Sequence, residues 1–122
     1  MSGKPEPSFA PCYAALYPLL AETARAYGYA LAIHGSMTRD FDLIAAPWVE
    51  DAAAPEAMIE ALCLATGGSM AARWVGAQPQ YSDVQPTKKS HGRLAWSIYL
   101  GKAYIDISVM PMLREPPPKE PT

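Results

Sequence analysis

The sequence contains few cysteines and no long apolar run, and both absences exclude classes of protein. Cys12 and Cys63 are the only cysteines among 122 residues. Neither lies in a Cys-x-x-Cys or Cys/His pattern, so we expect buried free thiols and no zinc site. No apolar stretch reaches the roughly 18 residues of a membrane span, and the N-terminus lacks the basic-then-apolar layout of a secretion signal. We therefore expect a cytoplasmic protein without membrane contact.

A surplus of basic residues is also missing. Ten Lys and Arg stand against 12 Asp and Glu, which gives a formal net charge of −2 and a sequence pI of about 5.6. This balance argues against a general nucleic-acid coat or a binder of anionic membranes, so nucleic acid is not indicated as a partner. Half of the residues are apolar, as in a soluble globular protein.

Periodic apolar residues are absent from both ends of the chain. Residues 1–10 and 111–122 are rich in proline and charged residues, and neither segment has enough periodic apolar content to fold alone. We therefore expect a disordered N-terminal tail over 1–10, a single domain over 11–110 and a Pro-rich C-terminal tail over 111–122.

The first half of the domain reads as helix followed by a hairpin. Pro18 interrupts the helical spacing of residues 12–27, which predicts a short helix before Tyr17 and a main helix from Pro18 to Tyr27. Residues 29–34 form an apolar strand, and 40–46 form a second one. The loop between them is short, which predicts an antiparallel hairpin.

A second helix follows. We expect Asp51 or a following residue to cap it, Pro55 to lie in its first turn and Gly67-Gly68 to end it. Residues 68–92 are hard to interpret beyond a strand over 71–75. We expect the three tryptophans to lie in the core or at its edge: Trp48, Trp74 and Trp96.

The clearest hairpin is the last one. Residues 93–100 and 103–110 alternate between apolar and polar side chains around the turn pair Gly101-Lys102, which fits a type II′ turn. Counting outward from the turn predicts one apolar face and one polar face that carries Asp106. The pairs expected on the apolar face are Leu100 with Ala103, Ile98 with Ile105, Trp96 with Ile107 and Leu94 with Val109; on the polar face they are Tyr99 with Tyr104, Ser97 with Asp106 and Ala95 with Ser108. The order of elements predicts an α+β domain with a small mixed or mostly antiparallel sheet and helices packed on one face.

The most informative segment is 34–45 (HGSMTRDFDLIA), where a Gly-Ser turn precedes two aspartates. Residues two apart on a strand face the same side, so Asp40 and Asp42 project together while Phe41 and Leu43 face the core. Adjacent carboxylates repel unless a cation, a proton or hydrogen-bond donors lie between them. Hard oxygen ligands at this spacing suit Mg²⁺ or Mn²⁺.

These features resemble the nucleotidyltransferase fold of minimal nucleotidyltransferases and polymerase-beta-like enzymes. The resemblance covers about residues 13–110 and depends on the Gly-Ser turn, the Asp-Phe-Asp pair and Asp106 on a later strand. It implies that Gly35 and Ser36 contact a nucleoside triphosphate. It further implies that Asp40, Asp42 and Asp106 bind metal and act in catalysis. The chain departs from the family pattern because only three residues separate the Gly-Ser pair from Asp40, where the family has a longer insertion with a helical turn.

Other residues could complete such a site. Four polar side chains precede the last hairpin and could add binding groups for the triphosphate: Lys88, Lys89, His91 and Arg93. Tyr99 and Tyr104 flank Asp106 on its own face, and we expect them near a bound base or acceptor. His34 is expected to be structural.

Each feature also has an ordinary structural explanation. Gly-Ser is common at hairpin turns, Asp40 could bond the loop backbone or pair with Arg39, and Asp42 could pair with a basic side chain.

Three functions follow. The first is an Mg²⁺-dependent nucleoside triphosphate binder which, if active, transfers a nucleotidyl group to a hydroxyl. The second is an inactive binding or inhibitory module, of a kind frequent in phage and mobile-element genomes, whose acidic face meets a partner protein. The third is a structural subunit that pairs a hairpin edge with a second copy.

Overall fold

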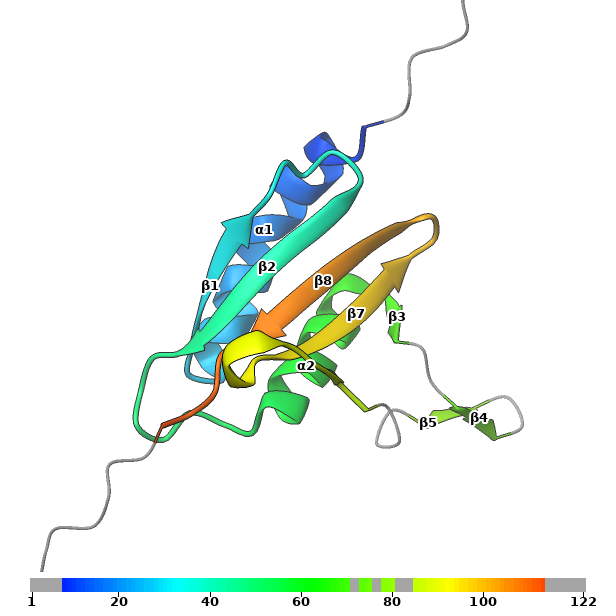
Figure 1. Ribbon diagram of the computed structural model, residues 1–122. Coiled ribbons are helices and arrows are strands. Elements are labelled where there is room, and N and C mark those ends of the chain that lie inside the picture. The colour runs from blue at the N-terminus through cyan, green and yellow to red at the C-terminus, as the bar shows by residue number, and fades with distance from the viewer. Residues whose placement is uncertain (1–7, 71–72, 76–77, 81–84, 114–122) are drawn as a thin grey trace, which may run out of the picture.

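The computed structural model describes residues 8–70, 73–75, 78–80 and 85–113. Two α-helices and a mixed sheet make up most of this part of the chain (Figure 1). The elements in chain order are α1 (Ala10–Ala26), β1 (Tyr29–His34), β2 (Asp40–Pro47), α2 (Pro55–Thr66), β3 (Ser69–Met70), β4 (Arg73–Val75), β5 (Gln78–Gln80), β6 (Thr87–Lys88), the short 3₁₀ helix η2 (Ser90–Gly92), β7 (Leu94–Leu100) and β8 (Ala103–Val109).

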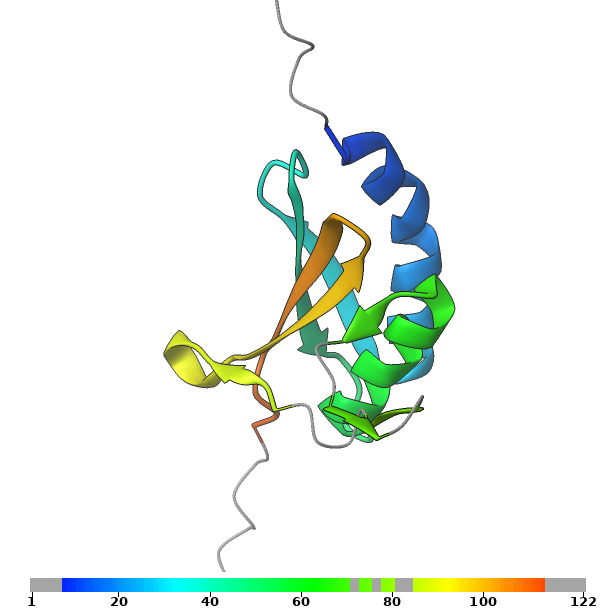
Figure 2. The same ribbon diagram turned by 90° about the vertical axis from the view of Figure 1, so that its right-hand side faces the viewer.

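The six-stranded sheet has the order β1-β2-β8-β7-β3. β6 pairs with the start of β7, whereas β3 pairs with its end. β2 and β8 pair in parallel, whereas β1 with β2 and β7 with β8 are antiparallel. Both helices lie on one side of the sheet, and the β6–η2 segment projects on the other side (Figure 2). The expected α+β class with helices on one face of a mixed sheet is confirmed. We call the side without helices the open face.

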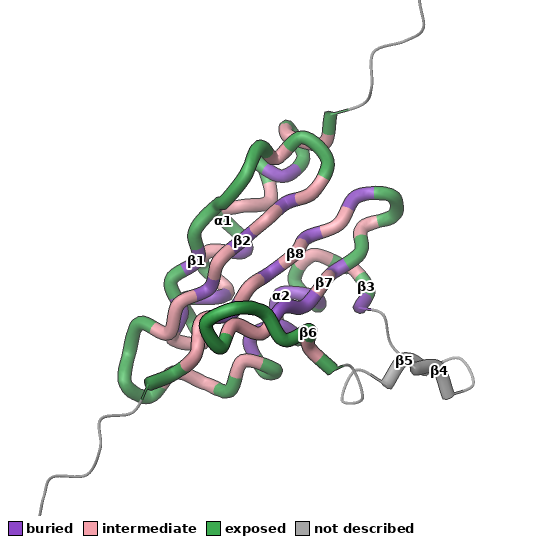
Figure 3. Tube along the Cα trace, in the orientation of Figure 1, coloured by how far each residue is buried: buried purple, intermediate pink, exposed green. Residues whose placement is uncertain are grey.

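The core lies between the helices and the sheet. Every second residue of β8 is buried, from Ala103 to Val109, and β2 shows the same alternation (Figure 3). Phe41 and Ile105 are fully buried and sit side by side in the register of these strands. Period-two burial therefore fixes which side chains of β2 and β8 face away from the helices.

Helix α1 is continuous, so the predicted break at Pro18 is wrong. Tyr13 and Leu20 are both fully buried on either side of Pro18, and burial on one helix face outweighs the missing backbone hydrogen bond. Pro18 itself is exposed, where water can bond the carbonyl that the proline leaves free. The helix begins at Ala10, inside the segment expected to be a tail, and the Phe9 N–H donates to the Thr38 carbonyl.

The β7–β8 register matches the prediction at every pair, from Leu94 with Val109 to Leu100 with Ala103. Gly101 has φ +64°, which glycine adopts without strain at the first turn position. A two-residue turn leaves no freedom in the register, which explains why sequence alone was sufficient here.

Helix α2 has Ala54, one of the residues that follow Asp51, at its N-cap. No side chain caps the helix, so Asp51 itself does not play that role. Pro55 does occupy the first turn, and Gly67 ends the helix in the left-handed conformation as expected. Gly68 is required for close packing, because a Cβ there would lie 2.6 Å from Ile98 Cγ2.

The two cysteines differ in exposure. Cys63 is buried as predicted, whereas Cys12 is exposed, contrary to the prediction; both are free thiols. Trp96 lies in the core, whereas Trp48 is 78% exposed because it follows β2 on a surface loop. The predicted strand 71–75 is found as β4 over its last three residues, while residues 71–72 and most of both predicted tails lie outside the described residues. No helix among the described residues combines the length and hydropathy that crossing a bilayer requires.

Candidate functional site

The open face carries a row of polar residues across four strands. Asp42 of β2 is in register with Asp106 of β8. His34 of β1 lies beside Asp42, and Ser97 of β7 lies beside Asp106. Because neighbouring strands are about 4.8 Å apart, the two carboxylates emerge next to each other. Asp40, two residues before Asp42, faces the same side.

The Gly-Ser turn lies directly over this row. Gly35 has φ +85°, and a Cβ placed there would lie 3.0 Å from Asp42 Oδ2. The predicted phosphate turn and one predicted metal ligand are therefore adjacent in space. The Ser36 hydroxyl accepts a hydrogen bond from the Thr38 N–H at 3.3 Å, and Met37 has φ +62°, so the turn is tight and contains no helix. Three residues, Met37, Thr38 and Arg39, connect the Gly-Ser pair to Asp40.

A tyrosine holds the first aspartate. The Tyr104 hydroxyl donates a hydrogen bond to Asp40 Oδ2 at 2.9 Å. This bond, burial and the nearby charges of all three aspartates raise the pKa of Tyr104 to about 12. The Tyr104 ring is tilted against Tyr99 with centroids 5.9 Å apart. Both tyrosines thus flank Asp106, as the register predicted.

Tyr13 of α1 braces this end of the site from the core side. Its hydroxyl donates to the Arg39 carbonyl at 2.5 Å and accepts from the Tyr104 N–H at 3.3 Å. Its ring stacks on Phe41 at 4.8 Å. One buried side chain therefore fixes the start of β2 relative to β8, which positions Asp40 beside Tyr104.

Asp106 lies in the centre of the charged region. Burial raises the pKa of Asp106, the charges of Asp42 and Asp40 raise it further, and Lys89 and Arg93 lower it. The like charges of Asp42 and Asp40 therefore oppose ionisation of Asp106, whereas the positive charges of Lys89 and Arg93 favour it.

The predicted basic residues all come from the β6–η2 segment and the residue after it. Arg93 is fixed: its Nε donates to the Ser90 carbonyl at 3.0 Å and its Nη1 to Ser108 Oγ at 3.1 Å. The Lys89 N–H donates to the Arg93 carbonyl at 2.9 Å. Lys88 pairs with Leu94 at the sheet margin, and His91 is exposed with φ +62°. Lys89 and Arg93 therefore reach the Asp106 region, while no contact connects Lys88 or His91 to it.

The donor set suits a hard divalent ion only in part. The described part of the chain holds no group of three or more His, Cys, Asp or Glu side chains placed to bind a metal. Asp42 and Asp106 form a facing pair of oxygen ligands, and Mg²⁺ often binds through one or two carboxylates together with substrate phosphates. Asp40 would join such a pair only by giving up its bond to Tyr104.

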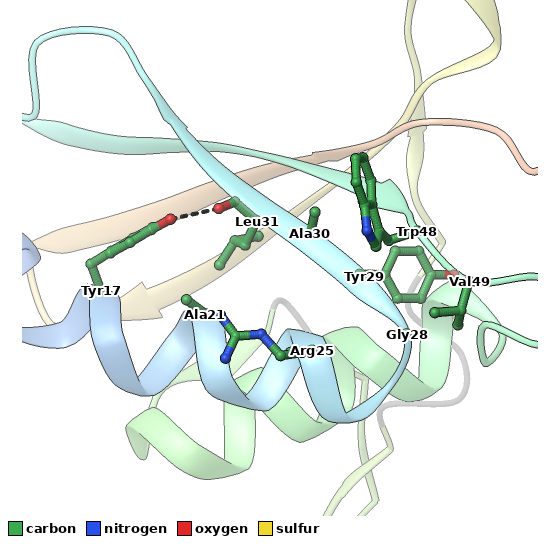
Figure 4. A pocket seen from close by; sticks show the side chains of 9 residues that line it. All are labelled: Tyr17, Ala21, Arg25, Gly28, Tyr29, Ala30, Leu31, Trp48 and Val49. Carbon is green, nitrogen blue, oxygen red and sulfur yellow. Dashed lines mark hydrogen bonds between the residues drawn. The ribbon is translucent and has the colours of Figure 1, made fainter.

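A cavity of about 430 Å³ lies elsewhere, between α1 and β1 (Figure 4). Its lining includes Tyr17, Ala21, Arg25, Tyr29, Leu31 and Trp48, and none of the three aspartates. It is separate from the carboxylate row.

No family model, curated protein or solved structure matches the chain.

Two features of the polar row on the open face were not predicted from the sequence. The parallel contact of β2 with β8 joins segments that no turn connects, so no local pattern indicates it. The position of His34 opposite Asp42 was not predicted either, and the structural role expected for His34 stays a prediction. A β1–β2 hairpin with its loop centred on Thr38 pairs His34 with Asp42, so counting outward from Thr38 could have predicted this pair.

Proposed function

We propose that this chain binds a nucleoside triphosphate with Mg²⁺ or Mn²⁺ on the open face, in a nucleotidyltransferase-like core, and transfers the nucleotidyl group to a hydroxyl. One observation carries the proposal: Asp42 faces Asp106 across β2 and β8, and Gly35 lies against Asp42. Gly35 and Asp42 come from one hairpin and Asp106 from a strand more than 60 residues later, and in this proposal each has a role in binding a metal-bound phosphate chain.

The residues have distinct roles in this proposal. Asp42 and Asp106 would hold the ion, whose chemistry is to neutralise the phosphate oxygens and lower the energy of the charged transition state. The missing side chain at Gly35 leaves room for phosphate beside the turn. Lys89 and Arg93 supply positive charge near Asp106. Asp40 already accepts a hydrogen bond from the Tyr104 hydroxyl. If the hydroxyl of an acceptor substrate replaced that of Tyr104, Asp40 could accept its proton as a general base.

The cytoplasm fits this proposal, because nucleoside triphosphates are available there. The absence of a helix turn at residues 35–39 means that phosphate would contact the turn backbone instead of a helix N-terminus. We expect this to weaken nucleotide affinity.

The second function, an inactive module that binds a basic partner surface, also has an observation in its favour. The Tyr104 hydroxyl is hydrogen-bonded to Asp40, which leaves Asp42 and Asp106 of the three aspartates to bind a metal. An acidic face without a complete ligand set would suit a basic protein surface. Metal dependence separates the two functions.

Thermal unfolding with nucleotide and metal tests the proposal. ATP, GTP, CTP and UTP would each be added at millimolar concentration with Mg²⁺ or Mn²⁺. A ligand at ten times its Kd stabilises the folded state by about 1.4 kcal/mol, which raises the Tm by several degrees. Asp42→Asn should abolish this shift, and Asp51→Asn, an exposed aspartate on the β2–α2 loop, should leave it unchanged.

Two results would reject nucleotide binding: no shift with any nucleotide, or an equal shift in the Asp42→Asn variant. A complex with a partner protein that is insensitive to chelator and broken by Asp42→Lys would then favour the second function. Release of pyrophosphate on addition of a hydroxyl acceptor would establish transfer.

A further inference from the structure

The outer edge of β1 is unpaired in the described part of the chain. β1 is the first strand of the sheet and pairs on one side only, with β2 (Figure 1). It is six residues long, whereas the opposite margin ends in two-residue strands, β3 and β6. Long unpaired edges readily accept another strand.

The backbone groups that point outward can be identified from the hydrogen bonds. The Trp48 N–H donates to the Gly28 carbonyl at 2.8 Å, so Gly28 faces β2. Successive residues of a strand face alternate sides, which turns the backbone groups of Tyr29, Leu31 and Ile33 outward. The Tyr17 hydroxyl bonds the Leu31 carbonyl at 2.6 Å, which agrees with this assignment. A carbonyl oxygen has two lone pairs, so it can accept a second bond.

The chemistry of β1 does not protect this edge. Its sequence, YALAIH, contains no Lys, Arg, Asp, Glu or Pro, which are the residues that usually prevent pairing at an edge. Four of its six residues are exposed, and the Ile33 side chain is 42% exposed.

The cavity between α1 and β1 opens beside the same edge. Tyr29 and Leu31 line it from the strand, and Arg25 lines it from the helix (Figure 4). Ile33 shares the strand face of Tyr29 and Leu31, because all three are two residues apart. An added strand would therefore place a side chain of this face at the mouth of the cavity.

We propose that β1 pairs antiparallel with β1 of a second copy, centred on Leu31. This register joins outward residues only: Leu31 with Leu31, and Tyr29 with Ile33 in both directions. The pattern is self-complementary, because the exposed Ile33 of each copy falls beside Tyr29 and the cavity of the other. Such a two-fold interface uses the same patch on both subunits and makes one continuous sheet. The proposal is independent of nucleotide binding.

The oligomeric state tests it. The full chain, with reductant because Cys12 is exposed, would be measured by light scattering and sedimentation over a dilution series. We expect a dimer that Ile33→Lys weakens at least tenfold. Leu64→Lys is the matched control, since Leu64 is 71% exposed on α2, and it should leave the dimer intact.

Charge at position 33 tests the register. In this pairing residue 33 lies beside a cavity lined by Arg25 of the other copy, so Ile33→Lys should weaken the dimer more than Ile33→Glu. Amide exchange of Tyr29, Leu31 and Ile33 should be slow at high concentration and should accelerate on dilution. A monomer at every concentration, a dimer unaffected by Ile33→Lys, equal effects of Lys and Glu, or fast exchange of these amides at high concentration would overturn the proposal.

Discussion

The two faces of β2 and β8 have the same backbone and opposite chemistry. Toward the helices, Phe41, Leu43, Ile105 and Ile107 are at most 1% exposed. On the open face, the same strands carry three aspartates, and burial together with the charges of Asp42 and Asp40 raises the pKa of Asp106. Apolar contacts stabilise the fold, while like charges next to each other reduce its stability unless something binds between them. The comparison assigns stability to the helix-covered face and leaves the open face for the binding that we propose.

Phe41→Ala tests the helix-covered face and should have the largest effect. Phe41 is fully buried and stacks on Tyr13, so its removal should cost about 3–5 kcal/mol of unfolding free energy. Ile44→Ala, half-buried on the open face of the same strand, should cost about 1 kcal/mol. Urea unfolding measures both. Equal losses would contradict the assignment of stability to one face.

Gly35→Ala tests the turn above the row. Alanine at a positive φ should cost about 1 kcal/mol, and the contact of its Cβ with Asp42 should add to this. Gly101→Ala is the control, because Gly101 also has positive φ but a Cβ there would meet nothing within 4 Å. Only Gly35→Ala should reduce the nucleotide-dependent rise in Tm. If nucleotide raised the Tm of Gly35→Ala as much as that of the wild type, the turn would not be part of the nucleotide site.

Tyr104→Phe tests the bond to Asp40. Its loss should cost about 1 kcal/mol and remove a tyrosine that titrates with a pKa of about 12, as followed by NMR of labelled tyrosine rings. Tyr99→Phe should leave that titration in place. If the proposal is right, Tyr104→Phe should also tighten metal binding, because Asp40 becomes available. A Tyr104 resonance that titrates near 10 would show that the hydrogen bond is absent.

Asp106→Asn should have the smallest effect on stability, and its sign is unusual. Because the folded pKa of Asp106 is raised above its unfolded value, ionisation of Asp106 destabilises the fold at neutral pH. This cost disappears as the pH falls through the raised pKa toward the ordinary value of 3.8. Without metal, Asp106→Asn should therefore stabilise the protein at pH 7 by about 0.2–1 kcal/mol. Unfolding measured from pH 7 to pH 4 should show a smaller stability gain on acidification in the variant. An identical pH profile would contradict the raised pKa of Asp106.

The sequence predicted what local rules determine. The β7–β8 pairs follow from a two-residue turn, and the shared face of Asp40 and Asp42 follows from strand periodicity. The continuation of α1 through Pro18 could not be predicted, because it depends on burial of Tyr13 and Leu20 against the rest of the fold. The parallel pairing that brings Asp42 to Asp106 is equally non-local, so the site itself could be suggested only by resemblance. The exposure of Trp48 likewise depends on where the chain goes after β2.

The most direct test of a shared binding site is selective NMR line broadening by substoichiometric Mn²⁺ in the presence of ATP. A paramagnetic ion broadens the resonances of nuclei close to it, so the measurement locates the ion without a mutation. We predict that the amides of Gly35, Asp42 and Asp106 broaden first, and that those of Glu56 and Glu60 on α2 remain sharp. Broadening that is uniform, or that centres on α2, would contradict the account.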